Sequence, residues 1–236
     1  MAKKQIKSKD RVADHGEVFT NEREVKAMCD LVEQECDRID SRFLEPACGD
    51  GNFLAEVLSR KLAKVKKLYS KSVYDYERYS ILALSSIYGV DIMKDNAEEC
   101  RARLFELWNK EYESNCKKNC NNEARQAAIY ILSQNILCGN VLTMMQVDDN
   151  QQDTNTPIIF PEWSLIMSTK LKRRDFRLDV LLKANTKPQD GEISLLDDEL
   201  ADEYLSINPV TGEYMPEPIK IYPAVHYKKI MEITND

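Results

Sequence analysis

Several features that would assign this chain to a common class are missing. Its 236 residues contain no run of about 18 apolar residues, and the basic start, MAKKQIKSKDR, lacks the apolar stretch of a signal peptide. We therefore expect no membrane contact and a cytoplasmic protein. None of the seven cysteines forms a CxxC pair, and the only histidines are His15 and His226. No metal site is expected, and Cys116 and Cys120 are interpreted as surface thiols in a reducing compartment.

The charge balance excludes a protein wrapped in nucleic acid over its whole surface, because the formal net charge is −7. Two local clusters are basic, namely the arm up to Asp14 and the stretch KLKRRDFR at 170–177. Either cluster could contact phosphates, but a disordered arm and a solvated or partner-binding face explain them equally well. The acidic run from Asp190 to Glu203 is interpreted as solvated.

Hydrophobic periodicity predicts helices that alternate with short buried strands through the first two thirds of the chain. Helices are expected at 21–38, 51–70, 94–113 and 121–134, with another before the strand that ends at Asp91. Strands are also expected at 41–47 and 135–142. This order predicts an α/β fold with a partial parallel sheet and helices on both faces.

The character of the sequence changes after Val147. A polar loop is expected at 148–157 and an apolar extended segment at 158–166, and prolines punctuate the last 30 residues. We therefore divide the chain into a basic arm (1–14), a ligand-binding domain (15–147) and an irregular C-terminal extension (148–236), which could contact a partner or DNA.

The stretch RFLEPACGDGNFLAEVL, at 42–58, places two glycines between a short strand and a helix. Glycine lets backbone N–H groups approach a ligand closely at such a turn. A dinucleotide site would need a third glycine and an acidic residue about 20 residues further on. Here no third glycine follows Gly51, and Asp91 comes 40 residues later. A Walker loop is excluded as well, since the chain contains no Gly-Lys-Ser/Thr.

A ligand without phosphates, S-adenosylmethionine, fits better. An acid at a strand end can pair with its ammonium group, and backbone N–H groups can receive its carboxylate. A second acid can accept both ribose hydroxyls, and a third polar group can meet the adenine amino group. Glu45, Asp91 and Asn140 stand at the expected strand ends where these contacts would fall.

Four segments resemble the cofactor motifs of adenine-N6 DNA methyltransferases of restriction–modification systems. HGEVFT, FLEPACGDGNFL, YGVDI and CGNVL occur in that family's order, although Asn140 stands where an aspartate is usual. The resemblance implies a Rossmann-like class I methyltransferase fold. It also implies a set of residues that bind S-adenosylmethionine: Phe19, Thr20, Glu45, Ala47, Cys48, Gly49, Gly51, Asp91, Ile92 and Asn140.

The family's catalytic motif, Asn/Asp-Pro-Pro-Tyr/Phe, has no counterpart here. That motif binds the amino group of a flipped adenine and stacks on its ring. This chain contains no Pro-Pro pair. Asn208-Pro209 lies too late and is interpreted as a turn, and Phe160-Pro161 lacks the amide, so a packed Trp163 is expected there. No catalytic residue is assigned.

The resemblance therefore implies one half of an adenine-specific DNA methyltransferase that is inactive alone. The strand at 43–46 would be left with an open edge, which a second chain carrying the catalytic strand would cover. Double-stranded DNA would then be bound by the complex. Two alternatives stay open: a catalytically inactive regulatory or scaffolding subunit that binds the cofactor, and a methyltransferase that acts on protein or a small molecule.

Overall fold

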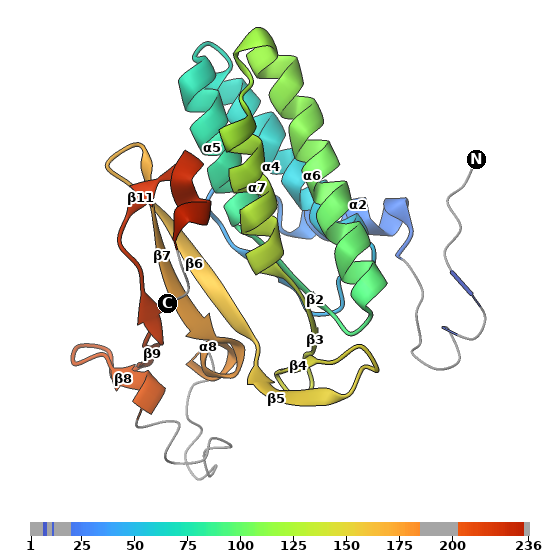
Figure 1. The fold of residues 1–236 in the computed structure, drawn as a ribbon, viewed down its shortest axis with the longest axis vertical. Coiled ribbons are helices and arrows are strands. Elements are labelled where there is room, and N and C mark those ends of the chain that lie inside the picture. Colours follow the sequence, from blue (N-terminus) through green and yellow to red (C-terminus); the bar gives the residue numbers. More distant parts are fainter. Residues whose placement is uncertain (1–6, 9–10, 12–19, 185–202, 234–236) are drawn as a thin grey trace.

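The computed structural model describes residues 7, 8, 11, 20–184 and 203–233 (Figure 1). The helices are α2 (Glu22–Leu31), α3 (Glu33–Cys36), α4 (Asn52–Tyr69), α5 (Val73–Ser85), α6 (Lys94–Cys116), α7 (Asn122–Asn135) and α8 (Leu178–Ala184), with the 3₁₀ helices η1 (Lys117–Asn119) and η2 (Tyr227–Glu232). The strands are β1 (Phe43–Glu45), β2 (Ile87–Asp91), β3 (Ile136–Asn140), β4 (Met145–Val147), β5 (Asp153–Pro157), β6 (Ile159–Ile166), β7 (Lys170–Arg177), β8 (Leu205–Ile207), β9 (Tyr214–Pro216), β10 (Lys220–Ile221) and β11 (Val225–His226).

The first sheet is mixed, in the order β1-β2-β3-β4-β5. Strands β1, β2 and β3 are parallel, with Leu44 opposite Tyr88 and Val90 opposite Leu137. The predicted α/β class is thereby confirmed. Strands β4 and β5 continue the sheet in antiparallel fashion, so the prediction of a loop throughout 148–157 is wrong. Backbone pairing with β4 holds β5 in the sheet although its polar side chains are largely exposed.

A second, antiparallel sheet follows in place of the predicted irregular extension. Its strands run in the order β10-β7-β11, and β6 also pairs with β7, in register from Ile159 opposite Arg177 to Ile166 opposite Lys170. The 158–166 segment is extended, as predicted, and its neighbour β7 is the basic stretch. Strands β8 and β9 form a separate hairpin, which lies at the lower left in Figure 1.

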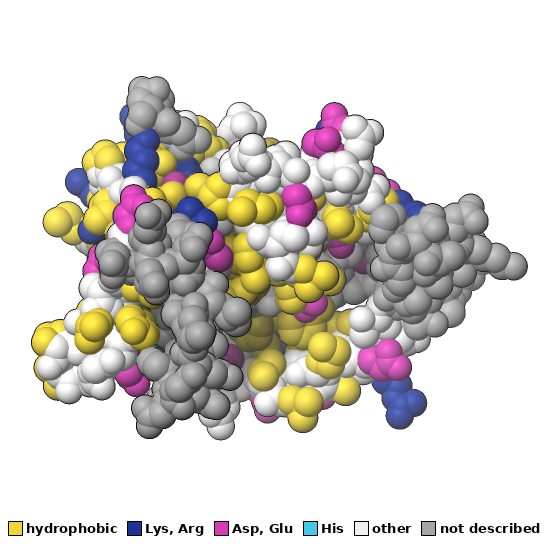
Figure 2. Space-filling model, turned by 90° about the horizontal axis from the view of Figure 1, so that it is seen from below, with side chains coloured by type: hydrophobic (Ala, Val, Ile, Leu, Met, Phe, Trp, Pro, Cys, Tyr) yellow, Lys and Arg dark blue, Asp and Glu magenta, His cyan; other side chains and the backbone are white. Residues whose placement is uncertain are grey.

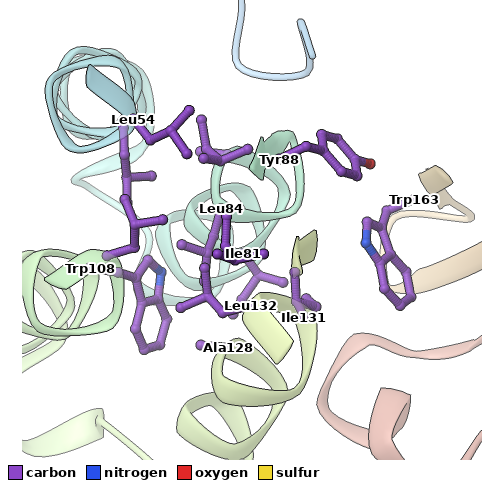
Figure 3. Close-up of a cluster of buried hydrophobic side chains, with 14 of the residues drawn as sticks. Leu54, Ile81, Leu84, Tyr88, Trp108, Ala128, Ile131, Leu132 and Trp163 are labelled. Atoms are coloured by element: carbon purple, nitrogen blue, oxygen red, sulfur yellow. The ribbon is translucent and has the colours of Figure 1, made fainter. Parts of the chain in front are cut away.

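One core joins the two sheets. Helix α4 packs on β1 and β2, α6 packs on β2 and β3, and α5 and α7 lie between these helices and β6. Figure 3 shows Leu54, Leu84 and Trp108 around a common centre, with Tyr88 and Trp163 toward the hairpin that β6 and β7 form. The indole N–H of Trp163 donates to Oδ1 of Asn135 at 2.8 Å, and Nδ2 of Asn135 donates to the carbonyls of Ser85 and Ile87.

The expected helix at 21–38 is interrupted at Val32, which leaves the helical conformation with φ −120° and ψ 31°. After α3, the chain turns toward β1 around Lys61, a fully buried lysine. Its Nζ donates to the carbonyls of Arg38 (2.9 Å), Ile39 (3.2 Å) and Ser41. Burial lowers the pKa of Lys61 to about 8. A side chain from α4 thus holds the loop that leads into β1.

The C-terminal residues are fastened to the helices by Glu77, a buried residue of α5. Its carboxylate accepts hydrogen bonds from the hydroxyls of Tyr112 and Tyr227 and pairs with Nζ of Lys228 at 2.7 Å. Cys116, nearby at the end of α6, is buried, so its interpretation as a surface thiol is wrong. No helix in the described ranges could cross a membrane, and those ranges contain no cluster of metal-ligating side chains.

Candidate functional site

The glycine turn after β1 is a left-handed one. Gly49 has φ +51° and Gly51 has φ +83°, conformations that side chains other than hydrogen disfavour. A Cβ at Gly51 would also lie 2.7 Å from Sγ of Cys100 in α6. The turn delivers the chain into α4, because the N–H of Ala55 donates to the carbonyl of Gly51. Glycine is therefore required here by backbone conformation and by close packing.

Asp91, at the end of β2, ties this turn to the neighbouring strand. Its Oδ2 accepts the N–H of Gly49 at 2.8 Å, and its Oδ1 accepts the N–H of Met93 at 2.8 Å and Nδ2 of Asn96 at 3.2 Å. Asp91 is only 8% exposed. The carboxylate therefore organises the two loops where β1 and β2 end, whatever else it binds.

A pocket of about 360 Å³ opens where the three parallel strands end. That volume lies within the range of small-molecule sites, roughly 300–1,000 Å³. Glu45 lines it from β1, and burial raises the pKa of this carboxyl, while a hydrogen bond with the backbone of Ala47 opposes that shift. A partly desolvated carboxylate at the rim of a pocket favours a cationic partner, because a nearby positive charge would offset its desolvation.

Asn140 lines the pocket from the end of β3. Its Oδ1 accepts the N–H of Leu142 at 3.0 Å, and its Nδ2 donates to Asp153 of β5 at 3.1 Å. These bonds fix the amide with its carbonyl toward the turn after β3. A carbonyl oxygen carries two lone pairs, so one N–H does not saturate it.

The structure brings most of the sequence-predicted site residues to this one pocket. Its lining includes Thr20, Glu45, Ala47, Cys48, Gly49, Asp91, Ile92 and Asn140. Gly51 lies beneath the turn, against Cys100, and does not line the pocket. Phe19 lies outside the described residues. The convergence follows from strand order, since the carboxyl ends of adjacent parallel strands meet at one edge of the sheet.

Sequence reasoning missed several lining residues, among them Met28, Phe53, Asn96 and Leu142. Asn96 has a readable signal, because it stands in the first turn of the helix that follows a strand-end aspartate. Met28 could not be found this way: it belongs to α2, and only tertiary packing brings that helix to the pocket. Leu142 is 90% exposed, so the pocket has an apolar, accessible margin.

Other candidate residues are engaged elsewhere. A hydrogen bond with Cys100 and burial raise the pKa of the Cys48 thiol, which argues against a nucleophile. Oδ1 of Asn208 accepts the N–H groups of Val210 and Thr211 in the turn between β8 and β9. The interpretation of Asn208-Pro209 as a turn is therefore confirmed, and so is a packed Trp163.

Several described cations of the two basic clusters pair with carboxylates of the same chain. Lys7 and Arg11 of the arm both pair with Asp95 at the start of α6. In β7, Arg173 pairs with Asp175, and Arg174 pairs with Glu162. His226 accepts the N–H of Lys228 and stacks on Tyr227. His15 and the acidic run at 190–203 are not described, except for Glu203.

No protein-family model, curated protein or solved structure matches this chain. The site therefore has to be interpreted from its own geometry and from the motifs that form it.

Proposed function

We propose that this chain is the S-adenosylmethionine-binding component of an adenine-specific DNA methyltransferase whose catalytic half lies on a second chain, and that its first sheet is part of a class I methyltransferase fold. The observation that carries the proposal is the meeting of Glu45, Asp91 and Asn140 around one pocket, at the ends of three adjacent parallel strands. The four sequence motifs are the basis for proposing this family of methyltransferases.

The residues present fit the cofactor. Glu45, whose carboxyl is partly buried, would pair with the ammonium group. The methionine end would lie against the glycine turn, where the N–H groups of Gly49 and Gly51 already bond to Asp91 and to the carbonyl of Cys48. Asp91 would accept the ribose hydroxyls, Ile92 would lie against the adenine and the carbonyl of Asn140 would meet its amino group. Phe19 and Thr20 are assigned to the methionine end. Bound S-adenosylmethionine would supply an activated methyl group.

The chain's own residues hold and orient that ligand but do not activate an acceptor. The sequence has no Pro-Pro pair, and the amide of Asn208 is occupied within a hairpin turn. Leu142 is exposed and the margin of the pocket is open, which leaves room for an adenine of DNA to approach the ligand. Activation of adenine N6 would therefore require groups from another polypeptide.

Figure 2 views the molecule from below, the side on which β3 leads into β4 and β5 in Figure 1. Among the described side chains visible there, hydrophobic ones spread across the middle, and Lys and Arg stand mainly toward the margins. Phosphate binding needs accessible cations. An apolar face at the site favours contact with protein, and we propose that DNA is bound by the complex, in the cytoplasm.

Calorimetry with S-adenosylmethionine tests the cofactor assignment. Glu45→Gln keeps an acceptor and removes the charge, and it should weaken binding by about 1.5–3 kcal/mol, roughly 10- to 150-fold. Asp91→Ala should weaken binding at least as much, but it also releases the turn, so its unfolding in urea is measured in parallel. Glu113→Ala, at an exposed pair with Arg125, is the matched control. Tight NAD binding without S-adenosylmethionine binding would overturn the assignment.

Methyl transfer by the isolated chain tests the missing catalytic half. With no amide–proline–proline–aromatic motif, the purified chain should transfer no labelled methyl group to DNA. Robust transfer would contradict a split enzyme, and Asn208 would then be the first residue to replace. Cofactor binding without any partner-dependent transfer would instead favour a regulatory or scaffolding subunit.

A further inference from the structure

Strand β1 forms one edge of the first sheet in the part of the chain that the structure describes. Among residues 20–184 and 203–233, β2 alone pairs with it. The N–H of Phe43 donates to Ser86 in the bend before β2, and Glu45 lies opposite Gly89. Because backbone groups alternate along a strand, the N–H and C=O of Leu44, between these residues, are directed away from β2. A row of unpaired backbone groups is a template for another strand.

An apolar groove of about 290 Å³ runs beside this edge. Leu44 and Tyr88 form one wall, since they stand opposite each other in the sheet and therefore share a face. The other wall consists of apolar side chains of β6, β7 and α8: Phe160, Pro161, Phe176, Leu178, Leu181 and Leu182. Arg42 and Glu162, paired at 2.8 Å, join the two walls at the groove. Leu182 is 40% exposed, so part of this wall faces solvent.

We propose that β1 and this groove bind an extended apolar segment of a second, different polypeptide, added as a parallel strand beside Leu44. Every second side chain of such a strand would enter the groove, because side chains alternate between faces. A second copy of this chain fits less well. Two-fold symmetry would pair β1 with itself in antiparallel fashion, and only one leucine would reach each groove.

The parallel direction rests on the proposed function. The carboxyl ends of parallel strands lie at one edge of the sheet, and the pocket begins at Glu45, the last residue of β1. A loop after an added parallel strand would therefore reach the pocket, where the acceptor-binding groups are needed. An antiparallel strand would carry that loop to the opposite edge.

The test uses a short synthetic peptide that alternates Val with Lys and ends in Asn-Pro-Pro-Tyr. Hydrogen exchange at Leu44 and calorimetry are followed while the peptide is titrated to millimolar concentration. Leu44→Pro removes the outward N–H and leaves the β1–β2 bonds, whereas Leu44→Ala keeps that N–H. Leu182→Glu places a charge in the groove at a partly exposed position, so folding should survive. Val210→Glu, at a residue 90% exposed in the β8–β9 turn, is the matched control.

The peptide should protect the Leu44 amide, and Leu44→Pro and Leu182→Glu should each weaken binding about tenfold. Val210→Glu should change nothing. The proposal would be overturned if millimolar peptide gave the Leu44 amide no protection, or if Leu44→Pro and Leu182→Glu both left peptide binding unchanged. A homodimer of this chain that protects the Leu44 amide would also overturn it. S-adenosylmethionine binding is measured on the same variants and should be unchanged. Its loss in the parent chain would instead refute the proposed function while leaving the edge result standing.

Discussion

The two sheets of this chain use polar side chains in opposite ways. In the parallel strands, Glu45, Asp91 and Asn140 stand at the ends and line a pocket. In the antiparallel sheet, Arg173 and Asp175 are almost fully buried and bond to each other through two pairs of atoms, at 2.7 and 2.9 Å. Polar groups around an open pocket can receive a ligand, whereas polar groups saturated inside a sheet can only hold it together.

The difference extends to the edges of the sheets. Strand β6 covers one side of β7, and β10 and β11 cover the other, so the central strand of the second sheet is enclosed. Within the residues that the structure describes, strand β1, next to the pocket, is paired on one side only. The β6–β7 hairpin does not pair with this edge and packs on α5 and α7 instead. The binding region is therefore the less complete of the two, which is the basis for expecting a partner there.

The largest effect is expected from Asp175→Ala. The substitution leaves the Arg173 guanidinium buried without its carboxylate, and Tyr222, whose hydroxyl donates to Asp175 at 3.1 Å, loses its acceptor. We expect a loss of about 3–5 kcal/mol in the free energy of unfolding, measured in urea. Glu22→Ala, which removes an exposed pair with Lys26, should leave the free energy of unfolding almost unchanged, because exposed ion pairs contribute little. Equal effects of the two substitutions would show that the buried pair of the second sheet contributes no more to stability than an exposed pair on a helix.

A smaller effect is expected where the two regions meet. Trp163→Phe deletes the indole N–H that Asn135 accepts and leaves that buried oxygen without this donor. The unfolding free energy should fall by about 1–3 kcal/mol. Unfolding is followed by circular dichroism and by hydrogen exchange at α7. If the β6–β7 hairpin unfolds separately while the α7 amides stay protected from exchange, the two sheets do not form one cooperative unit.

The smallest effect is expected in the pH dependence of ligand affinity, and it tests whether Glu45 contributes to binding in the pocket. Burial raises the pKa of Glu45, so in the free protein its contribution to stability is present below the usual glutamate pKa and is lost as pH rises through the raised value. A bound ammonium group requires the carboxylate. Affinity for S-adenosylmethionine should therefore fall on acidification from neutral pH through the raised pKa. Glu45→Gln should flatten this profile, and a parallel decline in both proteins would exclude Glu45 as the cause.

Prediction from the sequence succeeded where the signal is local. Apolar spacing located the helices on either side of β2, and the strand-end positions of Glu45, Asp91 and Asn140 predicted their convergence. It failed where pairing partners lie far apart in the sequence. Arg173 and Asp175 are part of a basic stretch that is typical of a solvated face, yet β6, β10 and β11 enclose them. The sequence gives no signal for β5, because its polar residues show no apolar alternation. Backbone pairing with β4 holds this strand in the sheet.

The sequence by itself determined the turn and the positions of the polar groups at the ends of the strands. Gly49 and Gly51 indicate the turn locally, because a left-handed backbone conformation depends on conformational freedom within a few residues. Only the tertiary structure decided which strand edge stays open and which charges are buried. These outcomes depend on which distant segments carry apolar surfaces that match one another. Here the β6–β7 hairpin (159–177) packs on α5 and α7, and no other strand in the described part of the chain pairs with the outer edge of Leu44.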